Sequence, residues 1–425
     1  MGEGRKACRP LRQSRPGAGD VRSRGLSRGE RPAARRGKSG DGRSQAGSLC
    51  RRASRRAGAA RRLCGAQSRI RSFQVTKSDV ARPQIRPLKG LLVGCGFFAR
   101  NHLHAWSETK GAEIAAVCDL DVERAGRYAE EFSIPQWHGT AEVLASGAFD
   151  FVDICTTMET HEALVALAVR HRVPVIVQKP FAPDIDTCRR IVANAKAAGV
   201  PVMVHENFRF QKIFRRIREI LDSGEIGELT FGRLSWRNAI DVYSNQPYLL
   251  KTERFMIMDV GIHMLDLARF LFGDANAVSC LRQSVKEGLA GEDAATILLR
   301  HDNAATSIVD VSYASHRFPN PFPQTLGEIE GRLGSIQILE GETLLVHSEG
   351  RQRRETIEAD GRNWTSDPWT QIQDSVPRTQ QHFIDTLLSG GAFETSAEDS
   401  LQTYALAEAA YRSAESGRLV TTAEL

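Results

Sequence analysis

The feature that most constrains this 425-residue chain is a regular alternation, from residue 88 onward, of short apolar runs with segments of helical periodicity. The runs are apolar throughout instead of alternating with polar residues, which is typical of strands buried on both faces of a parallel sheet. They lie at 88–94, 112–119, 149–156, 173–177 and 200–204, with a brief further segment at 134–137. Six strands joined by short loops and helices predict a doubly wound parallel sheet with right-handed crossovers.

The loop after the first predicted strand reads GCGFFA and opens a helix. This G-x-G-x-x-A pattern, in a strand–turn–helix context, is the dinucleotide-binding fingerprint. The first glycine permits the tight turn, the second lets a pyrophosphate approach the backbone, and the alanine lets helix and strand pack closely. The cofactor-binding residues predicted from it are Gly94, Cys95, Gly96, Phe97, Phe98 and Ala99.

Asp119 stands at the end of the second predicted strand, twenty residues after the fingerprint. A carboxylate at this place accepts hydrogen bonds from ribose hydroxyls and repels a 2′-phosphate, so it favours NAD. Arg124 lies close behind it and leaves NADP as the less favoured alternative.

The second half of the chain has a different pattern. Several apolar–polar alternating runs between 228 and 349 predict a largely antiparallel open sheet. A helix is expected at 256–273 and two more near the end of the chain, beginning at Pro377 and Ser400. We therefore expect an N-terminal domain at 86–206 and a C-terminal α+β domain at 207–425.

Chemically suitable side chains are concentrated at three positions. Lys179 leaves the carboxyl end of a predicted parallel strand, where open sheets bind ligands, and Pro180 stiffens the backbone after it. Asp259 and His263 are four residues apart and so share one face of the expected helix, and Asp266 extends that face. Because the rest of this helix is apolar, a polar stripe on it is expected to line a site.

The ordered set of these motifs resembles the Gfo/Idh/MocA oxidoreductase family, over residues 88–425. The resemblance is carried by GCGFFA at 94–99, Asp119, Thr156 and Thr157 with His161, QKP at 178–180, NFRF at 207–210 and DVGIH at 259–263. It implies hydride transfer between a nicotinamide and a hydroxyl-bearing carbon of a sugar or polyol. It also implies a homo-oligomer formed through the C-terminal sheet.

The resemblance further implies which residues form the site. Lys179, Asp259 and His263 match the family's catalytic lysine, aspartate and histidine, whereas Thr156, Thr157, His161, Gln178 and Lys179 fall near the nicotinamide half of the cofactor. A carboxylate-held histidine suits the removal of a hydroxyl proton near neutral pH. We favour His263 as base, Lys179 as the group that polarises the substrate oxygen and Asp259 as a hydrogen-bond partner of the substrate. The exchange of roles between Lys179 and His263 stays open. So do an NAD-dependent glycoside hydrolase and a non-catalytic regulatory homologue.

Gln178 departs from the resemblance, because the family has a glutamate there. We expect that glutamate to contact ribose hydroxyls, so that glutamine, which lacks the charge, gives a lower lysine pKa and weaker NAD⁺ binding. Gln178→Glu is then expected to bind NAD⁺ at least as tightly.

Charge is distributed very unevenly along the chain. Residues 1–70 hold 20 Lys and Arg against 4 Asp and Glu, and residues 71–425 hold 37 against 47, so the overall charge of +6 does not indicate nucleic-acid binding. The stretch 1–80 lacks the apolar residues of a core and is expected to be a disordered leader, or a translation from an upstream start codon. Eight cysteines without paired spacing, and no run long enough to cross a bilayer, predict a cytoplasmic protein with neither a metal site nor a membrane partner.

Overall fold

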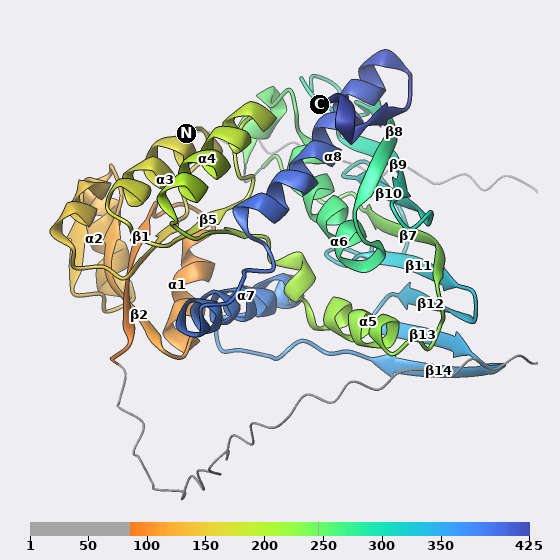
Figure 1. Cartoon of the computed structure of the whole chain (residues 1–425), viewed down its shortest axis with the longest axis horizontal. Helices are drawn as coiled ribbons and strands as arrows, with labels where there is room; N and C mark the ends of the chain where they lie inside the picture. Colours follow the sequence, from red (N-terminus) through yellow and green to blue (C-terminus); the bar gives the residue numbers. More distant parts are fainter. Residues whose placement is uncertain (1–85, 245) are drawn as a thin grey trace, which may run out of the picture. The chain divides into compact units, whose positions relative to one another are not determined.

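The computed structural model describes residues 86–244 and 246–425, so the predicted leader at 1–80 lies outside the described residues. The N-terminal part, coloured orange to yellow-green in Figure 1, forms a six-stranded sheet. Its strand order is β3-β2-β1-β4-β5-β6, and all neighbours are parallel. The strands are β1 (Leu88–Val93), β2 (Ala112–Cys118), β3 (Gln136–His138), β4 (Phe151–Ile154), β5 (Val175–Gln178) and β6 (Val202–His205). The predicted doubly wound sheet is confirmed, including the brief sixth strand.

Helices connect these strands and cover both faces of the sheet. They are α1 (Ala99–Glu108), α2 (Val122–Glu131), α3 (His161–Arg170) and α4 (Ile185–Ala198). Asp121 and Asp184 cap α2 and α4 by accepting backbone N–H groups of the first turn, which fixes where each helix begins. The sheet is buried on both sides, as its continuous apolar runs require.

The C-terminal part forms a nine-stranded sheet in the order β14-β13-β12-β11-β7-β10-β9-β8-β15. Only β7 and β10 pair in parallel, so the expected largely antiparallel sheet is confirmed. The strands are β7 (Leu229–Arg237), β8 (Ala275–Gln283), β9 (Ala294–His301), β10 (Thr306–Ser312), β11 (Leu326–Gly331), β12 (Gly334–Leu339), β13 (Thr343–Ser348), β14 (Arg351–Thr356) and β15 (Val420–Thr421). The last two were not predicted, since β14 is almost wholly polar and β15 has two residues.

Four longer helices accompany this sheet, and three of them begin at other residues than the sequence predicted, α8 by only three residues. They are α5 (Lys212–Asp222), α6 (Ile262–Phe272), α7 (Thr370–Ser389) and α8 (Ala397–Ser416). The helix expected from residue 256 begins as a π-helical turn (Ile257–Gly261) before α6, a feature that is frequent at functional sites. Helix α7 starts seven residues before the expected Pro377, because buried Ile372 and Val376 continue its apolar stripe ahead of the proline.

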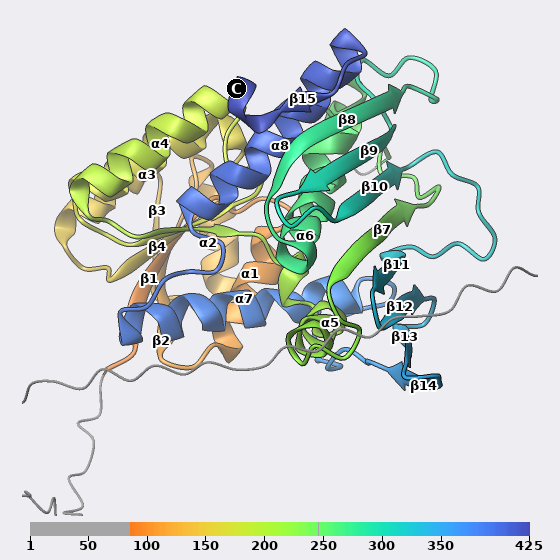
Figure 2. The same cartoon turned by 45° about the vertical axis from the view of Figure 1, so that its right-hand side comes forward.

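The last two helices connect both halves of the molecule. Helix α7 packs on α1 and β6, whereas α8 lies between α4 and the nine-stranded sheet, in contact with β8 and α6 (Figure 2). The carboxyl ends of β5 and β6 therefore face the π-helical turn that leads into α6. Within the described residues, no helix is both long and apolar enough to cross a bilayer.

Candidate active site

The loop after β1 has the conformation that its glycines predict. Gly94 has φ +98°, and a Cβ there would lie 2.8 Å from the carbonyl carbon and oxygen of Cys155, so both its backbone and its surroundings require glycine. A Cβ at Gly96 would meet nothing within 4 Å, which leaves open space beside the start of α1. Ala99 is fully buried against the sheet. The loop thus fits a pyrophosphate at the amino end of a helix.

Asp119 braces this loop through both oxygens of its carboxylate. One carboxylate oxygen accepts the N–H of Cys95 at 2.8 Å, and the other accepts the N–H of Asp121 at 2.9 Å. Arg124 approaches Asp119 at 3.3 Å and Asp121 at 3.5 Å, so its charge is paired with two carboxylates. This pairing reduces the attraction of Arg124 for a 2′-phosphate and agrees with the preference for NAD.

Thr156, Thr157 and His161 lie at the carboxyl end of β4. Thr160 donates a hydrogen bond to the hydroxyl of Thr156 at 2.7 Å, so that side chain is already oriented. His161 is fully buried, with its ring nitrogens 3.1 Å from the carbonyl oxygen of Phe181 and 3.2 Å from that of Thr156. Burial lowers the pKa of His161. Its ring ties together the loops that follow β4 and β5.

Lys179 lies at the end of β5 with its side chain 22% exposed. Its Nζ donates to the backbone oxygen of Asp259 at 3.0 Å and to Oδ1 of the same residue at 3.1 Å. The second carboxylate oxygen of Asp259 accepts the hydroxyl of Tyr313 at 3.1 Å. Burial, reinforced by the charge of Asp259, raises the pKa of Tyr313 well above its ordinary value, so the phenol keeps its proton and donates. Sequence reasoning missed Tyr313, which follows the end of β10.

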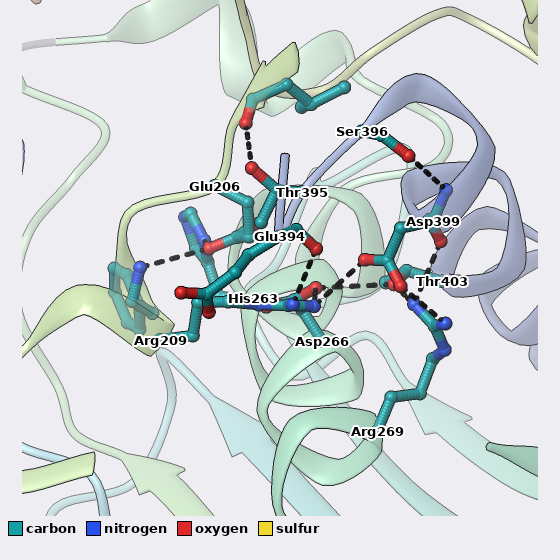
Figure 3. Close-up of polar contacts among 12 residues, drawn as sticks. Glu206, Arg209, His263, Asp266, Arg269, Glu394, Thr395, Ser396, Asp399 and Thr403 are labelled. Carbon is teal, nitrogen blue, oxygen red and sulfur yellow. Dashed lines mark hydrogen bonds and ion pairs between the residues drawn. The ribbon is translucent and has the colours of Figure 1, made fainter. Parts of the chain in front are cut away.

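His263 is held by a carboxylate that the sequence analysis did not select. Its Nδ1 lies 2.5 Å from Oε1 of Glu206, and its ring stacks on Phe208 with centroids 3.9 Å apart and planes 6° from parallel. Although burial alone would raise it, the neighbouring His263 holds the pKa of Glu206 below its ordinary value. Asp259 and His263 come from adjacent turns as expected, but each is bonded to another part of the chain. Figure 3 shows the pair of His263 with Glu206.

The expectation that Asp266 extends the polar stripe into the site is wrong. Asp266 accepts two hydrogen bonds from the guanidinium of Arg209, at 2.8 and 2.5 Å, and both side chains are buried (Figure 3). Asp399 and Arg269 extend this ion-pair network into α8. The stripe needed partners, as its burial implied, and it finds one of them in Arg209.

Comparisons with known proteins agree with this geometry. The family described as "Oxidoreductase family, NAD-binding Rossmann fold" matches residues 88–206, and "GFO/IDH/MocA C-terminal domain" matches residues 214–337. A protein from Rhizobium rhizogenes named D-apiose dehydrogenase is 48% identical over 334 residues, which are 78% of this chain and 97% of that protein. The chain belongs to the Gfo/Idh/MocA oxidoreductase family.

Two further relatives are similar over the same span. A D-apiose dehydrogenase from Paraburkholderia graminis is 46% identical, over 79% of this chain and 90% of that protein. The crystal structure of an oxidoreductase from Agrobacterium radiobacter, in complex with NAD⁺, L-tartaric acid and magnesium, is 47% identical with a TM-score of 0.78, over 79% of this chain and 99% of that one. The predicted family and activity class, an NAD-dependent dehydrogenase acting on CH–OH groups, are confirmed, and so is NAD as the cofactor.

Within the QKP motif, Gln178 differs from the expectation because its side chain is turned into the protein. Gln178 is 8% exposed, and both atoms of its amide are used inside the protein. Its Oε1 accepts the N–H of Lys179 at 2.7 Å, and its Nε2 lies 3.1 Å from Nε2 of His102. Each amide atom thus makes one contact inside the protein and keeps one further hydrogen-bonding position, so Gln178 as a cofactor-binding residue stays a prediction. His102, on α1, is part of this support.

Proposed function

We propose that this chain oxidises the anomeric CH–OH of a small aldose, with D-apiose as the first candidate substrate. Two relatives that carry this name are 46% and 48% identical over nearly their whole lengths, which supports the substrate class. The observation that carries the chemistry is the convergence of a histidine–carboxylate pair and a lysine–carboxylate pair beside the carboxyl ends of β5 and β6. Oxidation of a cyclic hemiacetal at this carbon gives a lactone, with one hydride and one proton removed.

His263 is proposed as the base that takes the hydroxyl proton. Because Glu206 accepts the Nδ1 proton, the neutral ring offers Nε2 as its acceptor, and the stacked Phe208 fixes the plane of the ring. Glu206 also stabilises the imidazolium that forms when the proton is taken up. A histidine paired with a carboxylate is a common arrangement in acid–base catalysis, and Glu206 is the positioning residue in this pair.

Lys179 is proposed to bind and polarise the substrate oxygen. Two of its hydrogen bonds go to Asp259, which fixes the direction of the ammonium, and a third N–H is free for a ligand. Asp259 is in turn held by Tyr313, and its remaining lone pairs suit a second hydroxyl of the substrate. A polyhydroxylated substrate offers the several oxygens that this set of donors and acceptors requires.

The cofactor side is proposed to use the loop 94–99, Asp119, Thr156, Thr157 and Lys179. The open space at Gly96 and the braced carboxylate of Asp119 fit a dinucleotide, whose nicotinamide supplies a hydride acceptor when bound. His161 is proposed to act indirectly, by holding the loop that carries Thr156. The boundary between a cofactor domain at 86–206 and a substrate domain at 207–425 is part of this proposal.

The assembly is proposed to be a homo-oligomer built on the outer face of the nine-stranded sheet. Leu281, Leu298 and Ile308 share this face on neighbouring strands, and Leu281 is 76% exposed. Exposed apolar residues that gather on one face of a sheet are typical of an interface. The described cysteines are all free, which supports a reducing, cytoplasmic location.

A substrate screen with and without His263 tests the function. The purified chain is incubated with NAD⁺ and a panel of aldoses, inositols and sugar acids that includes D-apiose, and NADH formation is followed by absorbance. We expect turnover with D-apiose, a loss of about 10²- to 10⁴-fold in kcat for His263→Ala, and no loss for His171→Ala, an exposed histidine. Full activity of His263→Ala, or release of nitrophenol from nitrophenyl glycosides without net NADH, would contradict the proposal.

A further inference from the structure

A continuous chain of buried hydrogen bonds leads from the core of the six-stranded sheet to the backbone of Lys179. Oδ2 of Asp153 lies 2.7 Å from Nδ1 of His102, and Nε2 of His102 lies 3.1 Å from the amide nitrogen of Gln178. The amide oxygen of Gln178 accepts the N–H of Lys179 at 2.7 Å. Asp153 and His102 are fully buried. The chain ends at the residue proposed to polarise the substrate.

The direction of every hydrogen bond in this chain follows from its two ends. The backbone N–H of Lys179 can only donate, so the oxygen of the Gln178 amide must face it and the NH₂ group must face His102. An amide NH₂ also only donates, which makes Nε2 of His102 an acceptor. The one ring proton of His102 is therefore on Nδ1, where it is donated to Asp153. Trp106 donates to the same carboxylate oxygen at 2.6 Å.

The groups around His102 leave Asp153 as the one charge of the cluster. The ring of His205, at the end of β6, lies against the ring of His102 with centroids 4.2 Å apart. Burial holds the pKa of His205 well below its ordinary value. The thiol of Cys155, directly after β4, also faces Asp153, and burial raises the pKa of Cys155 well above its ordinary value. From α7, the amide of Gln380 donates to the backbone oxygen of His102. Both neighbouring titratable groups are thus neutral.

With a glutamate at position 178, the buried hydrogen-bond chain would need its protons in different places. A carboxylate cannot donate to Nε2 of His102, and two lone pairs facing each other in a buried place are unfavourable. The contact is restored if His102 takes up one proton from solvent at Nε2, so that an imidazolium lies between the carboxylates of residues 153 and 178. The cluster then carries one net negative charge, as it does with glutamine. Glutamine gives the same support without any proton uptake.

We propose that Asp153, His102 and Gln178 are positioning residues for Lys179, and that Gln178 is matched to a neutral His102 so that this support is independent of pH. The role of Lys179 in this proposal rests on the proposed function. The protonation state of His102 rests on the hydrogen-bond geometry alone. The proposal predicts that in Gln178→Glu the support of Lys179 depends on the uptake of a proton by His102.

The sign of the effect in Gln178→Glu follows from linkage. Two flanking carboxylates raise the folded-state pKa of His102 above its unfolded value of about 6.5. The stability contributed by the imidazolium is then complete below that unfolded value and is lost as the pH rises through the folded-state pKa. One linked proton changes the unfolding equilibrium by at most about tenfold per pH unit in this window.

The first experiment measures denaturant unfolding of the full chain between pH 5.5 and 9. We expect wild type and Gln136→Glu, a glutamine exposed on the same sheet, to give parallel stability curves. Gln178→Glu is expected to be nearly as stable as these two proteins at pH 5.5. Towards pH 9 its unfolding equilibrium constant is expected to rise roughly tenfold or more above theirs. A Gln178→Glu curve parallel to wild type would overturn the proton-linked match.

The second experiment reads the wild-type ring directly and does not depend on a variant that folds. In histidine-selective ¹⁵N NMR, with His102→Gln used to assign the signal, His102 is expected to stay neutral with its proton on Nδ1 from pH 5.5 to 9. Titration in this range, or a proton on Nε2, would refute the proposed match. Neither experiment uses the substrate, so both can fail or succeed independently of the proposed activity.

A kinetic readout tests the positioning role itself. At saturating substrate and NAD⁺, kcat of Gln178→Glu is expected to approach that of wild type at pH 6 and to fall at least tenfold relative to it at pH 9, with a smaller change in KM. Equal kcat ratios at both pH values, in a variant that shows the stability effect, would mean that the chain supports the fold but does not position Lys179.

Discussion

The two ends of the site differ in how far apart in the sequence their interacting residues lie. At the nucleotide end, Gly94, Gly96 and Asp119 lie within 26 residues, and the N–H of Cys95 donates to the carboxylate of Asp119. At the substrate end, Lys179 meets Asp259, and His263 meets Glu206, across 80 and 57 residues. A local pattern encodes the first end, whereas the packing of two sheets assembles the second. Changes at the two ends should therefore affect different measurable quantities.

Replacement of Lys179 should give the largest separation between the two ends. Lys179→Met removes the ammonium held by Asp259 but leaves the loop at 94–99 untouched. We expect kcat to fall by about 10³-fold, the scale of one lost electrostatic contact to the reacting oxygen. The Kd for NAD⁺ measured by calorimetry should change far less, because Asp119 and the loop at 94–99 are unchanged. Lys196→Met, an exposed lysine on α4, should match wild type.

The same position distinguishes the two assignments of the base. If Lys179 polarises the substrate oxygen, Lys179→Arg keeps the positive charge and should retain more activity than Lys179→Met. If Lys179 is the base, arginine cannot take its place, and both variants should be equally inactive. Equal loss in both would therefore reverse the roles that we assign to Lys179 and His263.

The buried ion pair beside the substrate end should affect stability more than affinity. Arg209→Met leaves Asp266 buried without its bidentate partner, and breaking such a pair costs about 3–5 kcal/mol of unfolding free energy. Denaturant unfolding measures this change. Arg332→Met provides the control, because Arg332 and its partner Glu228 are both mostly exposed and the pair should contribute little. A loss for Arg209→Met no larger than that of the control would mean that the network in Figure 3 is not a structural support.

The strand–turn–helix geometry of the nucleotide end could be predicted because local features of the sequence mark its turn and the end of its second strand. Gly94 has a positive φ and no room for a side chain, and Asp119 terminates a strand, so both can be identified without tertiary contacts. The strands of both sheets other than β14 and β15 were predictable for a different reason, since burial on one or two faces leaves a direct record in the apolar pattern.

The partners at the substrate end were not predictable to the same degree. The i,i+4 spacing put Asp259 and His263 on one face but could not show that Lys179 and Glu206 would each take one of them. Glu206 had one signal that was available, because an acid directly after a buried parallel strand occupies the same kind of place as Lys179. Asp266 was assigned to the site because its partner, Arg209, lies 57 residues away.

Glu206 tests whether a contact that the sequence missed matters for chemistry. Glu206→Gln keeps an oxygen that can accept from both His263 and the N–H of Phe208, but removes the charge that stabilises the imidazolium. We expect kcat to fall by roughly 10- to 100-fold, which is the scale of one to two pKa units of lost stabilisation, with little change in the Kd for NAD⁺. Glu130→Gln, on the exposed face of α2, is the matched control.

The pH dependence of stability gives Glu206 a second signature. Its pKa is depressed in the folded state by His263, so its contribution is present above the unfolded value of about 4.3 and is lost as the pH falls through the lower folded value. Glu206→Gln should therefore lose less stability than wild type between pH 5 and pH 3. An identical acid limb in both proteins would show that the pair with His263 is not formed in solution.

Replacement of Asp119 should give the smallest effect, and the opposite of the Lys179→Met result: the affinity for NAD⁺ should change and kcat should not. Asparagine has one acceptor oxygen, whereas Asp119 accepts a backbone N–H on each of its two, so Asp119→Asn must place its NH₂ group against one of those donors. We expect the Kd for NAD⁺ to rise roughly tenfold, about 1.4 kcal/mol, and kcat at saturating NAD⁺ to stay within twofold of wild type. Removal of the charge should also narrow the preference for NAD over NADP, because Arg124 loses one of its two carboxylate partners. If kcat fell as strongly as affinity, the nucleotide and substrate ends would be coupled, and the separation between a locally encoded and a globally assembled end would not hold.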